Sequence, residues 1–250
     1  MRTYRHGIAG MVCSLGLAFT GQAETIYIDF GRTGAETTAS GWNNVAATVG
    51  GTANNTTTIN GQGTPGTPSV ELIDSTGTAS GVTLSVSFTQ TYDTGAAGSG
   101  ADYAGPYPAT VSTWPTTALS DGFFSQINNG GSTMNMSFTG LDNSASYDLM
   151  FYGARGGTGT ALNQALYTVT GGNGTSNRTS SVLNNSSQTP EFLGVTPNGG
   201  TILVSFTRGS AGTGSLNAMS ITAVPEPATV GFGLVALGSV FIMLRRRVDR

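Results

Sequence analysis

Apolar side chains recur at every second position along several short segments of the chain. Val82, Leu84 and Val86 alternate with serine and threonine, which is the period of a strand with one buried and one solvated face. The alternation returns further along, and turn-forming Gly, Asn, Asp and Pro residues separate the segments. Strands are therefore expected at Thr25–Phe30, Val70–Ile73, Val82–Thr89, Met134–Phe138, Tyr147–Phe151, Tyr167–Val169, Glu191–Val195, Ile202–Phe206 and Met219–Ile221.

This pattern predicts an all-β fold, an antiparallel two-sheet β-sandwich of the jelly-roll type. One stretch breaks the alternation: Ala118 to Ile127, with Asp121 as a cap and Phe123 and Phe124 as apolar positions, predicts a short helix that closes one end of the sandwich. The longest loops are expected at residues 31–44, 50–68, 90–117 and 171–190.

The first 23 residues have the order of a secretory signal. Arg2 and Arg5 precede an apolar run from Ile8 to Phe19, and the segment finishes with small residues at Ala23. We expect a signal helix at residues 1–23 that is cleaved after Ala23. The passenger domain is then residues 24–223, and the tail is residues 224–250.

The tail combines a proline-rich motif, an apolar run and a cluster of arginines. Residues 228–244 carry no charge, and as a helix they span about 26 Å, close to the hydrocarbon core of about 30 Å. They are expected to form a transmembrane helix, with the arginines on the cytoplasmic side and the passenger outside the inner membrane. The motif is Pro225, Glu226 and Pro227, and the arginines are Arg245, Arg246 and Arg247.

The three parts together resemble the PEP-CTERM sorting signal of Gram-negative bacteria. The resemblance implies recognition by an exosortase. It also implies localisation in the envelope or matrix of bacteria that make exopolysaccharide or biofilm. It implies a membrane anchor at first, then a place at the cell surface or in the extracellular matrix after processing. A plain C-terminal membrane anchor is the alternative interpretation.

Composition excludes several classes of protein. Charged residues make up 9% of the chain, lysine does not occur, and residues 24–223 hold eleven carboxylates against four arginines. Because phosphate backbones are bound by clustered basic residues, nucleic acid is not expected as a partner.

The single cysteine, Cys13, and the single histidine, His6, both fall in the predicted signal segment. A passenger without either residue type has no Ser-His-Asp or Cys-His nucleophile and no zinc site built on thiolate or imidazole. Paired carboxylates and a hard cation held by oxygen ligands remain as alternatives. We expect no cofactor, no metal and no enzymatic activity. Calcium would need clustered oxygen ligands, whereas the carboxylates are scattered and are interpreted as solvated turn residues. These include Asp29, Asp93, Asp102 and Asp121.

The passenger is similar to galactose-binding-like and carbohydrate-binding jelly rolls found ahead of this sorting tail. Short matching pieces bracket nearly all of the domain, and they bear on the architecture more than on a ligand. They are residues 28–31 (IDFG), 41–44 (GWNN), 140–142 (GLD), 147–155 (YDLMFYGAR) and 216–221 (LNAMSI).

Sugar recognition requires an aromatic face for the apolar side of a pyranose and polar groups for its hydroxyls. The candidates for such contacts are Trp42, Asn43, Tyr103, Tyr107, Trp114 and Arg155. The alternative is structural: Trp42 covers the core, and Arg155 pairs with Asp29 or Asp148. Burial of both tryptophans would count heavily against specific sugar binding.

The leading hypothesis is an exported, non-enzymatic protein that is structural or adhesive in the envelope or exopolysaccharide layer. A specific carbohydrate-binding module is the first alternative. A carboxylate-dependent glycan hydrolase or lyase is the second, and it requires two carboxylates about 5–10 Å apart across a cleft.

Overall fold

The computed structural model describes residues 24–32, 40–47, 57–62, 68–88, 103–125, 133–158, 163–210 and 212–224. They all belong to one compact unit, Ala23–Glu226. The expected signal helix at 1–23 and transmembrane helix at 228–244 lie outside the described residues. Within the described ranges, no helix has the length and apolar character needed to cross a bilayer.

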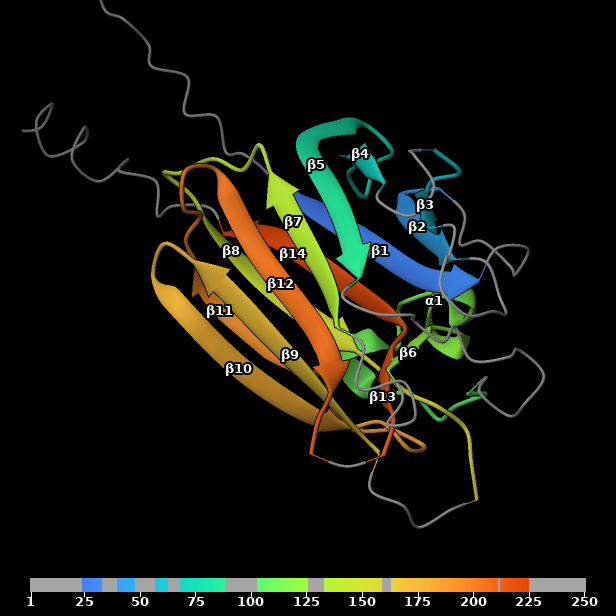
Figure 1. The fold of residues 1–250 in the computed structure, drawn as a ribbon. Helices are drawn as coiled ribbons and strands as arrows, with labels where there is room; N and C mark the ends of the chain where they lie inside the picture. Colours follow the sequence, from blue (N-terminus) through green and yellow to red (C-terminus); the bar gives the residue numbers. More distant parts are fainter. Residues whose placement is uncertain are drawn as a thin grey trace, which may run out of the picture. The chain divides into compact units, whose positions relative to one another are not determined.

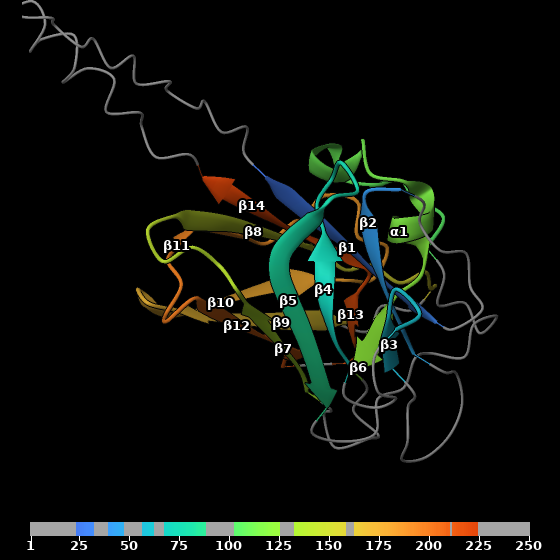
Figure 2. The same ribbon diagram turned by 90° about the horizontal axis from the view of Figure 1, so that it is seen from above.

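Two six-stranded sheets make up most of the fold, packed face to face (Figures 1 and 2). In spatial order, sheet A contains β11 (Glu191–Val195), β8 (Ser146–Tyr152), β14 (Ala218–Val224), β1 (Thr25–Arg32), β2 (Trp42–Ala47) and β3 (Thr57–Ile59). Sheet B contains β10 (Gly174–Ser181), β9 (Gln164–Gly171), β12 (Thr201–Arg208), β7 (Met134–Thr139), β5 (Ala79–Phe88) and β4 (Ser69–Ile73). A small third sheet pairs β13 (Gly214–Leu216) with β6 (Phe123–Ser125). The expected mostly-β fold with two main sheets is confirmed.

The inward-facing residues of the two sheets form the main core. Every second residue of β9 is buried, and Tyr167 of that strand stacks on Phe151 of β8, with ring centroids 4.8 Å apart. Phe206 of β12 lies against the same tyrosine, at 5.7 Å. The alternation read from the sequence is therefore the pattern that fills the space between the sheets.

The sandwich is not wholly antiparallel, so that part of the prediction is wrong. β1 and β2 run parallel, with Tyr27 opposite Trp42 and Arg32 opposite Ala47. A parallel pair requires the chain to return to the end where it started. Residues 33–41 join the two strands, and they can span about 30 Å, more than the roughly 20 Å length of the paired segment.

The predicted helix is displaced. α1 spans Thr116–Ser120, ends at Asp121, and is followed by the extended residues of β6. Pro115 precedes it, which suits a helix start because proline there loses no needed N–H group. Asp121 thus follows the helix instead of capping its beginning, and Phe123 and Phe124 belong to a strand.

Three strands occupy segments predicted as loops. β2 begins at the end of the 31–44 segment, β3 lies in the 50–68 segment, and β10 fills much of the 171–190 segment. β10 is exposed at every residue except Ser180, so it has no apolar alternation for a sequence pattern to detect.

Gly140 closes the end of β7 in a conformation that only glycine adopts easily. Its φ is +88°, and a Cβ there would overlap the backbone oxygen of Gly81. Gly77 has a similar φ of +85° with open space around it. We expect Gly140→Ala to lower the free energy of unfolding by about 3 kcal/mol and Gly77→Ala by about 1 kcal/mol, measured by urea denaturation. Equal losses would show that the contact with Gly81 carries no cost.

Candidate functional site

The aromatic residues predicted to contact sugar form a second core on the outer face of sheet A. There the segment that carries η1 (Ala109–Val111) and α1 packs against β1 and β2. Trp42 and Trp114 are each 8% exposed. Tyr27 stacks on Trp42 at 4.8 Å, and the two tryptophan rings meet edge to face at 5.5 Å. Both indoles therefore hold this segment onto the sheet.

Tyr103 and Tyr107 belong to the same second core. The hydroxyl of Tyr103 donates to the oxygen of Pro106 at 2.8 Å, and that of Tyr107 donates to the oxygen of Tyr103 at 2.9 Å. Burial raises the pKa of both phenols, so both remain neutral donors at neutral pH. Their hydrogen bonds fix the course of residues 103–107.

Asn43 is fully buried, and its side chain makes four hydrogen bonds within the protein. It donates to the oxygens of Tyr27 and Ile73, and it accepts from the amide of Ile73 and from the side chain of Asn60. These contacts tie β2 to its neighbours. They leave no donor or acceptor of the Asn43 side chain for a sugar.

Arg155 makes its described side-chain contact with Phe124. Its guanidinium carbon is 5.8 Å from the ring centroid of Phe124, a cation–π distance. The expected alternative partner Asp148 accepts instead from the amide of Gly194 at 2.8 Å. The structure thus brings Trp42, Trp114, Tyr103 and Tyr107 into one cluster, where they pack, whereas the described contact of the Arg155 side chain is with Phe124. The burial of the two tryptophans counts against the specific sugar site proposed around them.

A different surface has the features of a binding site, namely the outer face of sheet B. On this face, the alternate residues of neighbouring strands lie opposite one another, from β4 through β5, β7, β12 and β9 to β10. Serine, threonine and asparagine therefore form rows perpendicular to the strands. We name this surface the hydroxyl face. It consists of Ser69, Thr83, Ser85, Ser87, Asn135, Ser137, Thr139, Thr168, Thr170, Thr175, Asn177, Thr201, Leu203 and Ser205.

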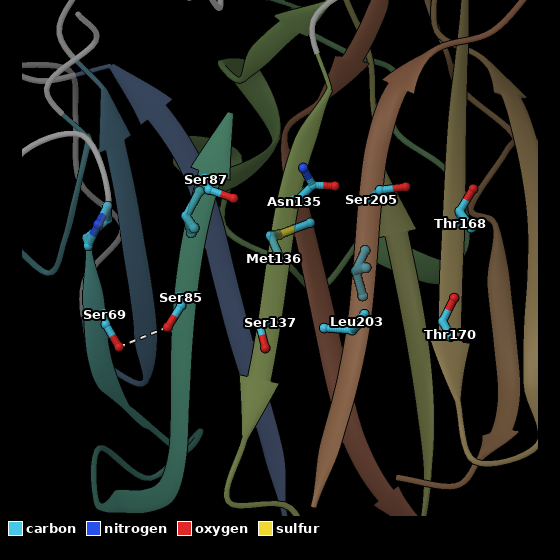
Figure 3. Close-up of a pocket in the computed structure, with 13 residues that line it drawn as sticks. Ser69, Ser85, Ser87, Asn135, Met136, Ser137, Thr168, Thr170, Leu203 and Ser205 are labelled. Carbon is cyan, nitrogen blue, oxygen red and sulfur yellow. Dashed lines mark hydrogen bonds between the residues drawn. The ribbon is translucent and has the colours of Figure 1, made fainter. Parts of the chain in front are cut away.

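A hollow of ≈ 550 Å³ lies in the middle of the hydroxyl face (Figure 3). The hollow crosses the sheet from β4 to β9. The part between β5 and β9 covers three strand spacings, a width of about 14 Å. Its volume falls in the range of ligand sites. The lining residues are Pro68, Ser69, Ser85, Val86, Ser87, Asn135, Met136, Ser137, Thr168, Thr170, Leu203, Val204 and Ser205.

Hydroxyl groups near the rim of the hollow are already paired. Ser85 donates to Ser69 at 2.8 Å, and Figure 3 shows this bond at the β4 side. On the β9 side, the hydroxyl of Thr168 donates to Asn177 at 2.7 Å, and those of Thr170 and Thr175 are 2.9 Å apart.

The polar groups on the floor of the hollow are different. Among the described residues, the side chains of Ser87, Asn135, Ser137 and Ser205 have no hydrogen-bond partner. Leu203, 49% exposed, lies between them as an apolar contact. Free donors and acceptors around one apolar side chain can bind a ligand that carries hydroxyls on one edge and C–H groups on its face.

The described residues that line the hollow carry no charge. The groups they offer are hydrogen-bond donors and acceptors and apolar contact surface. Within the described part of the chain, no three His, Cys, Asp or Glu side chains gather in a way that could hold a metal ion.

Sequence reasoning missed this surface, although a signal for it existed. The strand at 82–89 was read as having one hydroxylic face, but a single strand does not reveal whether its neighbours continue that face. Only the registers of β5, β7, β12 and β9 align the serines and threonines into rows.

The fold and this surface define a β-sandwich protein with a polar sheet face, which also carries the exposed Glu71 of β4 opposite Thr83. At its C-terminus, residues 223–247 match the PEP-CTERM protein-sorting motif, which confirms the resemblance read from the tail. The match includes Pro225, Glu226, Pro227 and Arg245 to Arg247. It marks an exported protein with a C-terminal sorting signal that an exosortase reads.

The similarity of the chain to solved structures is distant. The carbohydrate-binding module TmCBM61, in complex with β-1,4-galactotriose, is 13% identical with a TM-score of 0.31; the alignment covers 42% of this chain and 74% of the module. The enzymatically active domain of tailspike protein 4 from bacteriophage CBA120 is 15% identical with a TM-score of 0.32, over 56% of this chain and 19% of the tailspike. No curated protein matches the sequence.

Proposed function

We propose that the protein is a non-enzymatic component of the cell surface or exopolysaccharide matrix that contacts neutral polysaccharide through the hydroxyl face. The observation that carries this proposal is the set of unpaired polar side chains on the floor of an uncharged hollow. A neutral polyol matches these groups, whereas a charged ligand would find no counter-ion. The sorting motif supports the same setting, because it marks an exported protein.

The contact is weak and of low specificity in this proposal. Tight sugar sites use aromatic platforms, and both tryptophans are committed to packing instead. Leu203 offers a smaller apolar surface in their place. This favours the adhesive or structural role over a specific carbohydrate-binding module. The described lining residues include no carboxylate, which weighs against a glycan hydrolase or lyase at this surface.

The jelly-roll connectivity is also part of the proposal. From β7 onward the chain crosses from sheet B to sheet A at β8, returns at β9, crosses again at β11, returns at β12 and crosses at β14. Such alternation between two packed sheets is typical of jelly rolls.

We further propose that the signal segment is removed, that residues 228–244 hold the precursor in the inner membrane, and that processing releases the passenger to the surface or matrix.

Retention on immobilised neutral polysaccharides tests the proposed function. The double variant Ser137→Leu, Ser205→Leu removes two free hydroxyls from the floor of the hollow and adds bulk there. We expect retention to weaken about tenfold, because two hydrogen bonds contribute roughly 1.4 kcal/mol or more.

The matched control changes the same two strands on the same face outside the hollow. Thr139→Leu, Thr201→Leu adds similar apolar surface without touching the lining, so retention should stay near that of the unmodified protein. Equal weakening by both double variants, or by neither, would contradict binding in the hollow.

A further inference from the structure

β10 is the last strand of sheet B, and it pairs with β9 alone among the described strands (Figure 1). All of its residues except Ser180 are exposed. Eight residues pair with β9 in unbroken register, from Gly174 opposite Gly171 to Ser181 opposite Gln164. The side of β10 away from β9 is therefore a long, regular sheet edge.

The free edge presents unpaired backbone groups at alternate residues. The two-residue turn after Gly171 directs the N–H and C=O groups of Gly174, Ser176, Arg178 and Ser180 toward β9. Those of the odd-numbered residues then point outward. Ser181 fits this assignment, because its amide donates to the side chain of Gln188 at 2.7 Å.

Thr175, Asn177 and Thr179 accordingly offer their backbone groups to the open side. Nη1 of Arg178 donates to the oxygen of Asn177 at 3.1 Å, and a carbonyl oxygen with two lone pairs can accept a second bond.

The other described edges of the two large sheets carry features that oppose pairing. β4 has an irregularity between Glu71 and Ile73, β11 has one between Phe192 and Val195, and β3 is three residues long. Bulges, charges and shortness are the usual protection of an edge. β10 contains neither a bulge nor a proline, so it can act as a template for another strand.

We propose that β10 pairs in antiparallel fashion with β10 of a second copy of this chain, centred on Asn177. In this register Asn177 faces Asn177 of the other copy, and Thr175 faces Thr179. The outward backbone groups of all three residues then pair, forming six hydrogen bonds if each of these facing pairs exchanges two. Facing threonine pairs, such as Thr175 and Thr179, stabilise neighbouring strands.

Arg178, the one charged residue of β10, favours this register over the register shifted by one residue. Centring on Arg178 would place two arginines directly opposite each other and would need the Ser181 amide, which Gln188 already occupies. Centring on Asn177 sets Arg178 opposite Ser176, while the guanidinium keeps its contact with Phe192 of its own chain, 5.5 Å from the ring centroid.

Such a dimer joins two copies of sheet B into one continuous sheet. The two-fold axis runs perpendicular to the sheet, so both hydroxyl faces point to the same side. This geometry is independent of what the hydroxyl face binds, although two hollows on one side would strengthen any contact with a long polymer.

Cysteine cross-linking of the full-length chain tests the register. In a Cys13→Ser background, Asn177→Cys places two thiols in directly opposite positions, about 5.5 Å apart between Cα atoms, within the range of a disulfide. Mild oxidation should give a disulfide-linked dimer on a non-reducing gel. Thr175→Cys alone should give at least about tenfold less dimer, because its opposite residue is Thr179, and an equal mixture of Thr175→Cys and Thr179→Cys chains should cross-link.

Charge variants on the Asn177→Cys background give a second test. Thr175→Lys, Thr179→Lys sets two lysine pairs in opposition and should abolish cross-linking, whereas Thr175→Lys, Thr179→Glu creates two opposite-charge pairs and should keep it. All these positions are exposed, and circular dichroism checks that each variant folds. Absence of the Asn177→Cys dimer, or equal cross-linking by every single-cysteine chain, would overturn the proposal.

Discussion

Replacing Trp42 by alanine is expected to lower the free energy of unfolding by about 4 kcal/mol, the usual cost of truncating a large buried aromatic residue. The indole stacks on Tyr27 and meets Trp114 edge to face. Its removal leaves a cavity under the segment that carries η1 and α1. Urea denaturation measures the loss, and Trp42→Phe, which keeps a stacking ring, should cost less than half as much.

The same variant separates packing from binding. Trp42 does not line the hollow, so Trp42→Ala molecules that remain folded should be retained on neutral polysaccharide as well as the unmodified protein. If Trp42→Ala folds normally but is no longer retained on the polysaccharide, the aromatic cluster and not the hydroxyl face contains the binding site.

Asn217→Ala should have an effect of similar size, about 4 kcal/mol, because several buried polar groups lose their partners at once. The fully buried side chain accepts from the amide of Ala154 at 2.7 Å and from the hydroxyl of Ser215 at 2.8 Å, and it donates to the oxygen of Leu119 at 3.1 Å. It thereby links α1 to the ends of β8 and β13.

The matched control for Asn217→Ala is Asn135→Ala. The Asn135 side chain is exposed and makes no hydrogen bond to the described residues, so its loss should change the free energy of unfolding by no more than about 0.5 kcal/mol. Similar values for the two variants would mean that the buried network around Asn217 adds no stability.

Strands with one buried face could be predicted from the sequence. β7 and β12 alternate apolar and polar residues, and burial follows that alternation because successive side chains point to opposite faces. β10 escaped prediction because its identity as a strand comes from hydrogen bonds to β9 and not from apolar side chains. The parallel pairing of β1 and β2 likewise depends on a connection whose direction no local pattern records.

The candidate site was harder to predict for a related reason. Tyrosine and tryptophan suit both a sugar platform and a buried contact, and the choice depends on which segment covers them. Here residues 103–120 cover Trp42. The hydroxyl face, by contrast, arises from residues far apart in the sequence, such as Ser85, Ser137 and Leu203, that only the sheet register brings into one row.

The most direct test of the central claim compares two exposed leucines. Leu203 is 49% exposed on the floor of the hollow, and Leu193 is 68% exposed on β11 of the other sheet. In methyl-labelled protein titrated with a neutral polysaccharide that retains it, the NMR signals of Leu203 should shift while those of Leu193 stay in place. Signals of Leu203 that remain unchanged at saturation, or shifts confined to Leu193 or to residues 103–120, would contradict binding at the hydroxyl face.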